Sequence, residues 1–149
     1  MSLAAEYLRR EGLSVVETRE PGGTELAERI RQILLDTELH GRITSRAELL
    51  LYLASRHQHS AEVIIPALEL GKAVLCDRYA DSSTAYQGGA RGLGIEEVEE
   101  LNELVIPRWP DLTILLDVPV ELGISRRIGS VPDRLEGGTG SIGSIRGSR

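Results

Sequence analysis

Residues 71–79 are Gly71-Lys72-Ala73-Val74-Leu75-Cys76-Asp77-Arg78-Tyr79. The apolar, partly β-branched run from Ala73 to Cys76 is typical of a buried strand in a parallel sheet. Charged and phenolic side chains follow at once, and ligands of open α/β sheets bind beyond the carboxyl ends of the strands. Arg78 can bind a phosphate with two hydrogen bonds, and Asp77 can bind a metal ion directly or through water. The alternative is a surface ion pair at a strand end.

The bulk composition indicates one globular domain. The chain has 149 residues and a formal net charge of −6, which argues against binding to a nucleic acid polymer. Its single cysteine, Cys76, falls within the predicted strand, where a small buried core residue is the simplest interpretation. No apolar run approaches the ~18 residues of a membrane span, and no signal peptide opens the chain. We therefore expect a cytoplasmic protein without a membrane partner.

Strands and helices alternate along the chain, which predicts a parallel, doubly wound sheet. Further strands are expected at 13–18 and 112–117. Ser45 and Glu48 form a capping box, which predicts a helix start at Ser45. Other helical segments are expected at 4–10, 25–35, 63–70, 81–87, 95–105 and 120–127.

Two polar pairs lie on the helix that starts near Ser45. Tyr52 and Arg56 share a helix face, so their side chains can reach one space. They either pack as an apolar ring under an arginine stem or stack on and hydrogen-bond a flat heterocycle. His57 and His59 point to different faces, which is poor metal geometry and favours a polar helix surface.

Five motifs, in this order, resemble bacterial thymidylate kinase, and the resemblance covers about residues 4–136. They are Arg19-Glu20-Pro21-Gly22-Gly23-Thr24, the Tyr52/Arg56 pair, Asp77-Arg78-Tyr79, Ser82-Ser83-Thr84-Ala85-Tyr86-Gln87-Gly88-Gly89 and Asp133-Arg134-Leu135-Glu136. Thymidylate kinases transfer the terminal phosphoryl group of ATP to dTMP with Mg²⁺. Family members form homodimers, and the resemblance implies one here.

The resemblance implies a role for each matching residue. Tyr52 would stack on thymine, Arg56 would bind its carbonyl, and Arg78 would hold the dTMP phosphate beside Asp77, which would hold Mg²⁺ through water. The turn above the monophosphate and the nucleoside pocket would be formed by Glu20, Pro21, Ser82, Ser83, Tyr86 and Gln87. A mobile lid over ATP would supply Arg126, Arg127 and Arg134. Phosphoryl transfer needs in-line positioning and charge neutralisation, which arginines and Mg²⁺ provide.

The implied fold is a three-layer, P-loop nucleoside monophosphate kinase-like α/β sheet, incomplete because its central first strand and its last strand are missing. The phosphate loop Gly-x-x-x-x-Gly-Lys-Ser/Thr does not occur in the sequence. We therefore expect a partial kinase-like domain over residues 1–136 that transfers phosphate slowly or not at all. Residues 137–149, rich in Gly and Ser, are expected to form a disordered tail.

The sequence leaves alternative functions open. The chain could be a non-catalytic module that binds a deoxynucleoside monophosphate, or another nucleotide kinase, such as one acting on deoxynucleosides. It could also be an inert remnant that binds no nucleotide. Titration with dTMP, ATP, thymidine and dCMP separates these alternatives.

Overall fold

The centre of the molecule is a pair of parallel strands, β1 (Val15–Arg19) and β2 (Ala73–Asp77). The computed structural model describes residues 1–119, 121 and 122. The strand register runs from Val15 opposite Ala73 to Arg19 opposite Asp77. Because the strands are parallel and in this register, their carboxyl ends lie side by side. The segments that follow Arg19 and Asp77 therefore begin at the same edge of the sheet.

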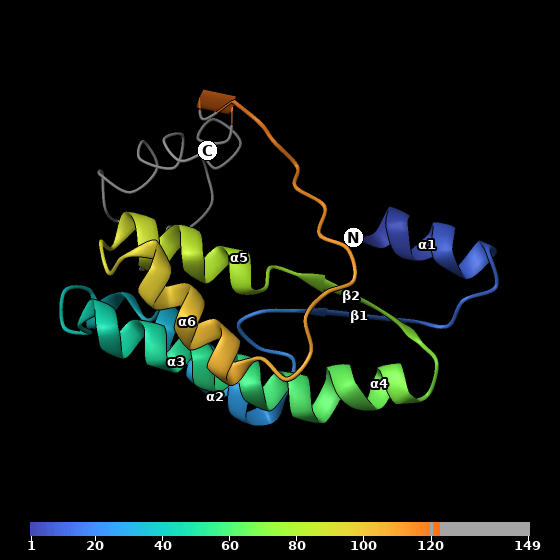
Figure 1. Cartoon of the computed structure of the whole chain (residues 1–149), viewed down its shortest axis with the longest axis horizontal. Helices are drawn as coiled ribbons and strands as arrows, with labels where there is room; N and C mark the ends of the chain where they lie inside the picture. Colours follow the sequence, from blue (N-terminus) through green and yellow to red (C-terminus); the bar gives the residue numbers. More distant parts are fainter. Residues whose placement is uncertain (120, 123–149) are drawn as a thin grey trace.

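Helices lie on both sides of the strand pair, with α1 on one side and α2, α3 and α4 on the other (Figure 1). The main helices are α1 (Ser2–Arg10), α2 (Glu25–Leu35), α3 (Ser45–His59), α4 (Ile65–Glu69), α5 (Ala80–Ser83) and α6 (Ile95–Val105). A 3-10 turn, η1 (Thr37–Leu39), and two π-helical segments, η2 (Ser60–Ile64) and η3 (Thr84–Ala90), complete the described elements. The α/β class predicted from the sequence is confirmed, and the predicted helix at 95–105 has the bounds of α6.

Threonine side chains cap helices α2 and α3. Thr24 accepts a hydrogen bond from the Ala27 amide, and Thr44 accepts one from the Ala47 amide. Helix α3 begins at Ser45 as predicted, but the capping side chain is Thr44 and not Ser45. The Glu48 carboxylate does not complete a capping box, because it turns inward and accepts a hydrogen bond from Gln87.

Three small apolar clusters form the core of the described part of the chain. Ile64, Tyr79, Ala80 and Ile106 make one cluster, against which part of β2 packs. Leu49, Leu53 and Val98 join α3 to α6, and Ile30, Leu34 and Tyr52 join α2 to α3. Helix α3 contributes to two of these clusters, so it is the element that connects the helices to one another.

The strand predicted at 112–117 is wrong in this structure. These residues are in irregular backbone, and Leu112, Ile114, Leu115 and Leu116 are 71–86% exposed. A strand forms only beside a hydrogen-bonding neighbour. The described residues form a two-stranded sheet and place no strand between β2 and this segment. The apolar sequence alone therefore does not make it a strand.

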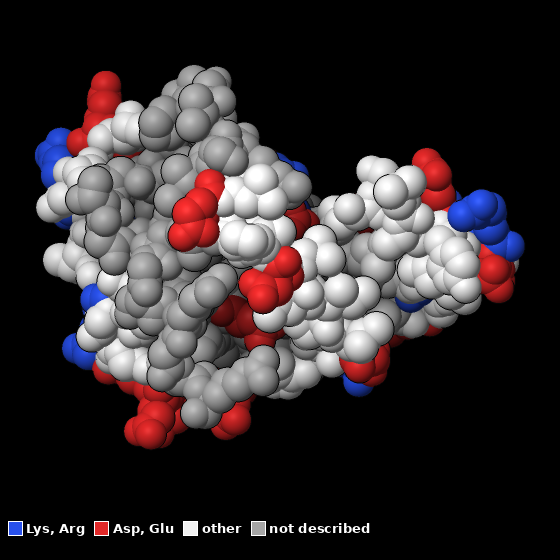
Figure 2. All heavy atoms as spheres, turned by 90° about the horizontal axis from the view of Figure 1, so that it is seen from above, with Lys and Arg blue, Asp and Glu red and all other residues white. Residues whose placement is uncertain are grey.

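Several expectations fall outside the described residues. These are most of the helix at 120–127, the lid arginines Arg126, Arg127 and Arg134, and the tail at 137–149. Asp and Glu side chains are spread over the described part of the face in Figure 2, while Lys and Arg lie mostly near its edges. Within the described part of the chain, no helix has the length and apolar content needed to cross a bilayer.

Candidate active site

Two turns meet at the carboxyl edge of the sheet. The segment Glu20–Gly23 leaves β1, and Arg78 and Tyr79 leave β2. The Glu20 amide donates to the Asp77 carbonyl at 3.0 Å, which continues the strand pairing by one residue. This edge is where ligands bind in open α/β sheets.

Arg78 has an unusual backbone conformation at this edge. Its φ is +67°, in the left-handed region that non-glycine residues avoid. The guanidinium carbon lies 5.4 Å from the centre of the Tyr86 ring. Burial lowers the pKa of the Arg78 guanidinium, but Tyr86, Asp77 and Tyr52 raise it by more, so the pKa lies above that of an ordinary arginine. A charged guanidinium, a group that binds anions, is therefore held beside the Tyr86 ring.

Arg56 is buried, with 1% of its surface exposed, and it connects four segments of the chain. Its Nε donates to Glu20 Oε2 at 2.7 Å and its Nη1 donates to Asn102 Oδ1 at 2.8 Å. Its Nη2 donates to the Tyr79 carbonyl and to Ser83 Oγ, both at 3.0 Å. These bonds within the described residues use four of its five N–H groups.

The predicted pocket residues after β2 divide into two groups. Ser83 and Gln87 are buried and already bonded, Ser83 to Arg56 and Gln87 to Glu48. Ser82 and Tyr86 are partly exposed, and Tyr86 lies beside Arg78. Segment η3 is π-helical, and such segments are frequent at functional sites. The residues of the motif at 82–89 thus lie near one another, but only some of their side chains face outward.

Residues 1–133 match the family model described as thymidylate kinase. The chain belongs to the thymidylate kinase family. A thymidylate kinase from Halalkalibacterium halodurans is 56% identical over 122 residues, which are 81% of this chain and 58% of that protein. One from Citrifermentans bemidjiense is 51% identical over 132 residues, which are 88% of this chain and 58% of that protein.

A crystal structure of thymidylate kinase from Ehrlichia chaffeensis has the same fold. It superposes with a TM-score of 0.71 at 40% identity and covers 85% of this chain and 70% of that one. The P-loop nucleoside monophosphate kinase-like fold expected from the sequence is therefore confirmed. The chain spans 58% of the length of the two relatives named above.

The sequence of this thymidylate kinase family member did not reveal that His59 is part of the buried network at the site. The imidazole is fully buried at the end of α3, so the prediction of a polar helix surface is wrong for His59 and right for the exposed His57. The partners of His59 are Glu20, at 3.1 Å from Nδ1, and Thr18, at 2.6 Å from Nε2. Both partners lie far away in the sequence, so no local pattern points to them.

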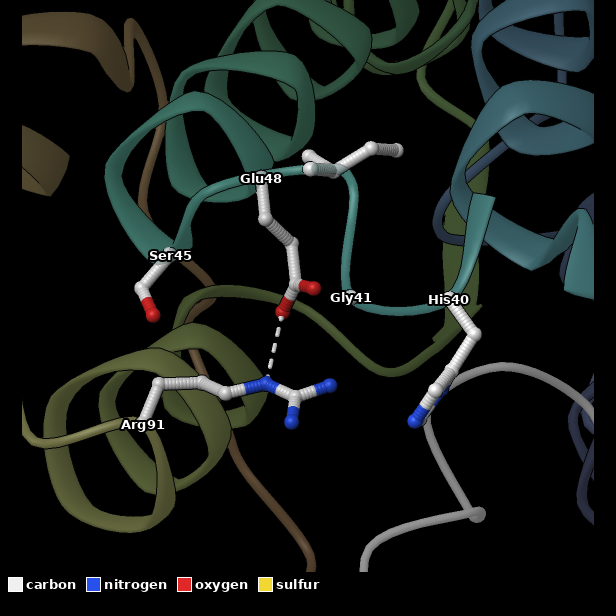
Figure 3. Close-up of a pocket in the computed structure, with 6 residues that line it drawn as sticks. His40, Gly41, Ser45, Glu48 and Arg91 are labelled. Carbon is white, nitrogen blue, oxygen red and sulfur yellow. Dashed lines mark hydrogen bonds and ion pairs between the residues drawn. The ribbon is translucent and has the colours of Figure 1, made fainter. Parts of the chain in front are cut away.

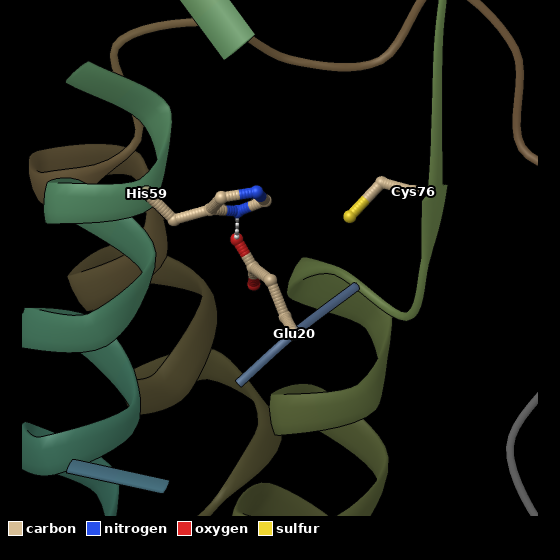
Figure 4. Close-up of side chains that lie close together, drawn as sticks. All are labelled: Glu20, His59 and Cys76. Atoms are coloured by element: carbon tan, nitrogen blue, oxygen red, sulfur yellow. Dashed lines mark hydrogen bonds and ion pairs between the residues drawn. The ribbon is translucent and has the colours of Figure 1, made fainter. Parts of the chain in front are cut away.

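Glu20, His59 and Cys76 each offer a metal-ligating atom, and these atoms lie within 4.8 Å of one another (Figure 4). Each atom is already engaged. Glu20 bonds Arg56 and His59, His59 also bonds Thr18, and the Cys76 thiol donates to the Arg78 carbonyl at 3.2 Å. Burial, together with the charges of Glu20 and Asp77, raises the pKa of Cys76 to about 12. A protonated thiol is a poor metal ligand, so the cluster is better described as a hydrogen-bonded core.

Cys76 should therefore react slowly with thiol reagents. At pH 8 a pKa of about 12 leaves far less thiolate than an ordinary cysteine has, and the greater nucleophilicity of that thiolate offsets only part of the loss. We expect labelling of the folded chain to be about 10- to 100-fold slower than labelling in urea at the same pH. Stopped-flow measurement with a disulfide reagent checks this, and equal rates in the two conditions would contradict it.

A separate small cavity of about 130 Å³ is lined by His40, Gly41, Ile43, Ser45, Glu48 and Arg91 (Figure 3). Arg91 Nε lies 3.3 Å from Glu48 Oε1 at its wall. Its lining contains none of the residues expected to bind dTMP. It is also much smaller than the ~300 Å³ of the smaller ligand sites, so it does not change the assignment of the site.

Asp77 fits the expected metal role. Its carboxylate is exposed at the end of β2, beside Arg78, whereas the carboxylate of Glu20 is buried and bonded to Arg56 and His59. Mg²⁺ is commonly held by one or two carboxylates together with waters and substrate phosphates. Of these two carboxylates, Asp77 is the one that suits Mg²⁺.

Proposed function

We propose that this chain binds dTMP at the carboxyl edge of its sheet and that the protein phosphorylates dTMP to dTDP with ATP. The observation that carries the proposal is the Arg78 guanidinium, whose carbon lies 5.4 Å from the centre of the Tyr86 ring, beside the turn that follows β1. A fixed cation next to aromatic side chains suits a nucleotide, which has an anionic phosphate and a flat base.

Each residue then has a defined task. Arg78 binds the phosphate, and Tyr52, which packs on Ile30 and Leu34, offers its ring to thymine. Ser82 and Tyr86 line the sugar side. Arg56 fixes Glu20 and Ser83 and presents its remaining N–H group to the base, while Pro21 and Gln87 shape the wall. Asp77 would hold Mg²⁺ or its water, and Mg²⁺ would neutralise charge on the transferring phosphoryl group. The lid arginines would act on the same charge.

Calorimetric titration of the chain with dTMP tests the proposal. We expect a dissociation constant between roughly 1 μM and 1 mM, the ordinary range for enzyme substrates. Thymidine should bind more weakly because it lacks the phosphate that Arg78 binds. No heat with dTMP would contradict the proposal, and equal affinity for dTMP and dCMP would favour another nucleotide kinase.

The slow phosphate transfer expected from the sequence stays a prediction. A coupled assay with dTMP and ATP measures it separately from binding. The homodimer and the cytoplasmic location expected from the resemblance also stay predictions, and sedimentation of the chain tests the first.

A further inference from the structure

His59 bridges the last part of β1 and the turn that follows it. Its imidazole is 0% exposed. A carboxylate can only accept, so Nδ1 carries a proton and donates to Glu20 Oε1 at 3.1 Å. On the opposite side of the ring, Nε2 lies 2.6 Å from the Thr18 hydroxyl. One ring thus connects a strand residue to the first residue of the turn.

The far end of the turn also lies against this ring. A Cβ atom added to Gly23 would come within 2.5 Å of His59 Cδ2 and 2.7 Å of Nε2. Gly23 has a φ of +89°, in the region that favours glycine. The backbone at Gly23 therefore approaches the imidazole more closely than any side-chain-bearing residue allows. His59 contacts the turn at both ends, through Glu20 and against Gly23.

Helix α2 also holds the turn, at Pro21 and at Gly23. Arg31 Nη1 donates to the Pro21 carbonyl, and the Gly23 amide donates to Glu28 Oε1, both at 2.9 Å. Arg56 shares Glu20 with His59, but Arg56 also binds α5 and α6. The described hydrogen bonds of the His59 ring go only to β1 and the turn. A change at His59 therefore acts on the turn more selectively than a change at Arg56.

We propose that His59 is a positioning residue for the dTMP site, which fixes the turn Glu20–Gly23 through its bonds to Glu20 and Thr18. This role rests on the proposed binding of dTMP beside that turn. His59 does not touch the nucleotide. It sets the distance between the turn and Arg78, and small displacements of positioning groups have large effects on binding.

Two amide substitutions separate the two bonds of the ring. In H59N the side-chain amide nitrogen takes the place of Nδ1 and keeps the bond to Glu20. In H59Q the amide takes the place of Nε2 and keeps only the contact with Thr18. We expect dTMP binding to weaken about tenfold in H59Q and by less than about threefold in H59N, since a hydrogen bond to a charged group contributes ~1.5 kcal/mol or more. The matched variants H57N and H57Q should bind as the unmodified chain does.

A measurement without nucleotide tests the same role. NMR relaxation of the Gly22 and Gly23 amides in the free chain should show greater mobility in H59Q than in H59N. Unchanged mobility and unchanged dTMP affinity in folded H59Q would overturn the role of His59. Absence of dTMP binding by the unmodified chain would overturn the proposed function instead. If H59Q does not fold, T18V tests the same role, because it removes the hydroxyl that bonds His59 Nε2. We expect T18V to bind dTMP about threefold more weakly than the unmodified chain. Unchanged dTMP affinity in T18V would overturn the role of His59.

Discussion

Replacing Arg56 with methionine should lower the free energy of unfolding by about 3–5 kcal/mol, because it leaves one partner of a buried ion pair uncompensated. The Arg56 and Glu20 side chains are 1% and 3% exposed. The substitution removes the guanidinium from Glu20 and also removes the donors to Asn102 and Ser83. Urea denaturation followed by circular dichroism measures the loss.

Two further variants isolate the cause of this loss. R46M removes an exposed pair with Glu97, whose side chains are 67% and 40% exposed, and should change stability by less than about 1 kcal/mol. E20Q/R56M should lose less stability than R56M, because no uncompensated carboxylate remains. If R56M loses no more stability than R46M, the buried network around Arg56 does not stabilise the fold.

Replacing Arg78 with alanine should weaken dTMP binding by about 100-fold or more. Two hydrogen bonds from a guanidinium to a phosphate contribute roughly 3 kcal/mol together, which corresponds to more than a factor of 100. Because Arg78 has a φ of +67°, R78G should lose the same affinity but be about 1 kcal/mol more stable than R78A. Calorimetry with dTMP and thermal unfolding measure the two effects.

The control for Arg78 is R46A, which removes an equal charge far from the site in sequence and leaves the turn after β2 unchanged. It should bind dTMP as the unmodified chain does. Tight binding of dTMP by R78A would show that Arg78 does not bind the dTMP phosphate. Equal stability of R78A and R78G would mean that the left-handed backbone at this position costs little.

Local patterns predicted the elements that later formed. The apolar run from Ala73 to Cys76 and the helix periodicity over 95–105 depend on neighbouring residues, so they are visible in the sequence alone. The placement of Arg78 at a strand end followed in the same way. The strand predicted at 112–117 is absent, since a strand also requires a hydrogen-bonding neighbour, which sequence periodicity does not reveal.

Long-range contacts explain the other errors. His59 looked like a surface histidine because Thr18 and Glu20 are far away in the sequence. The capping box at Ser45 failed because Gln87 and Arg91 draw the Glu48 carboxylate into the interior. Tyr52 and Arg56 share a helix face as predicted. The hydrogen bonds from Arg56 to Glu20, Asn102, Ser83 and Tyr79 could not be predicted, because these partners are far from Arg56 in the sequence.

The arrangement around Arg56 also bears on how the molecule fluctuates. One guanidinium joins the turn after β1, helix α5 and the last turn of α6 to α3. A local opening of any one of these segments must break a bond inside the protein interior, where water does not replace it at once. These four parts of the chain should consequently unfold as a single cooperative unit. Local unfolding at lower free energy should be confined to elements outside this unit, such as α1.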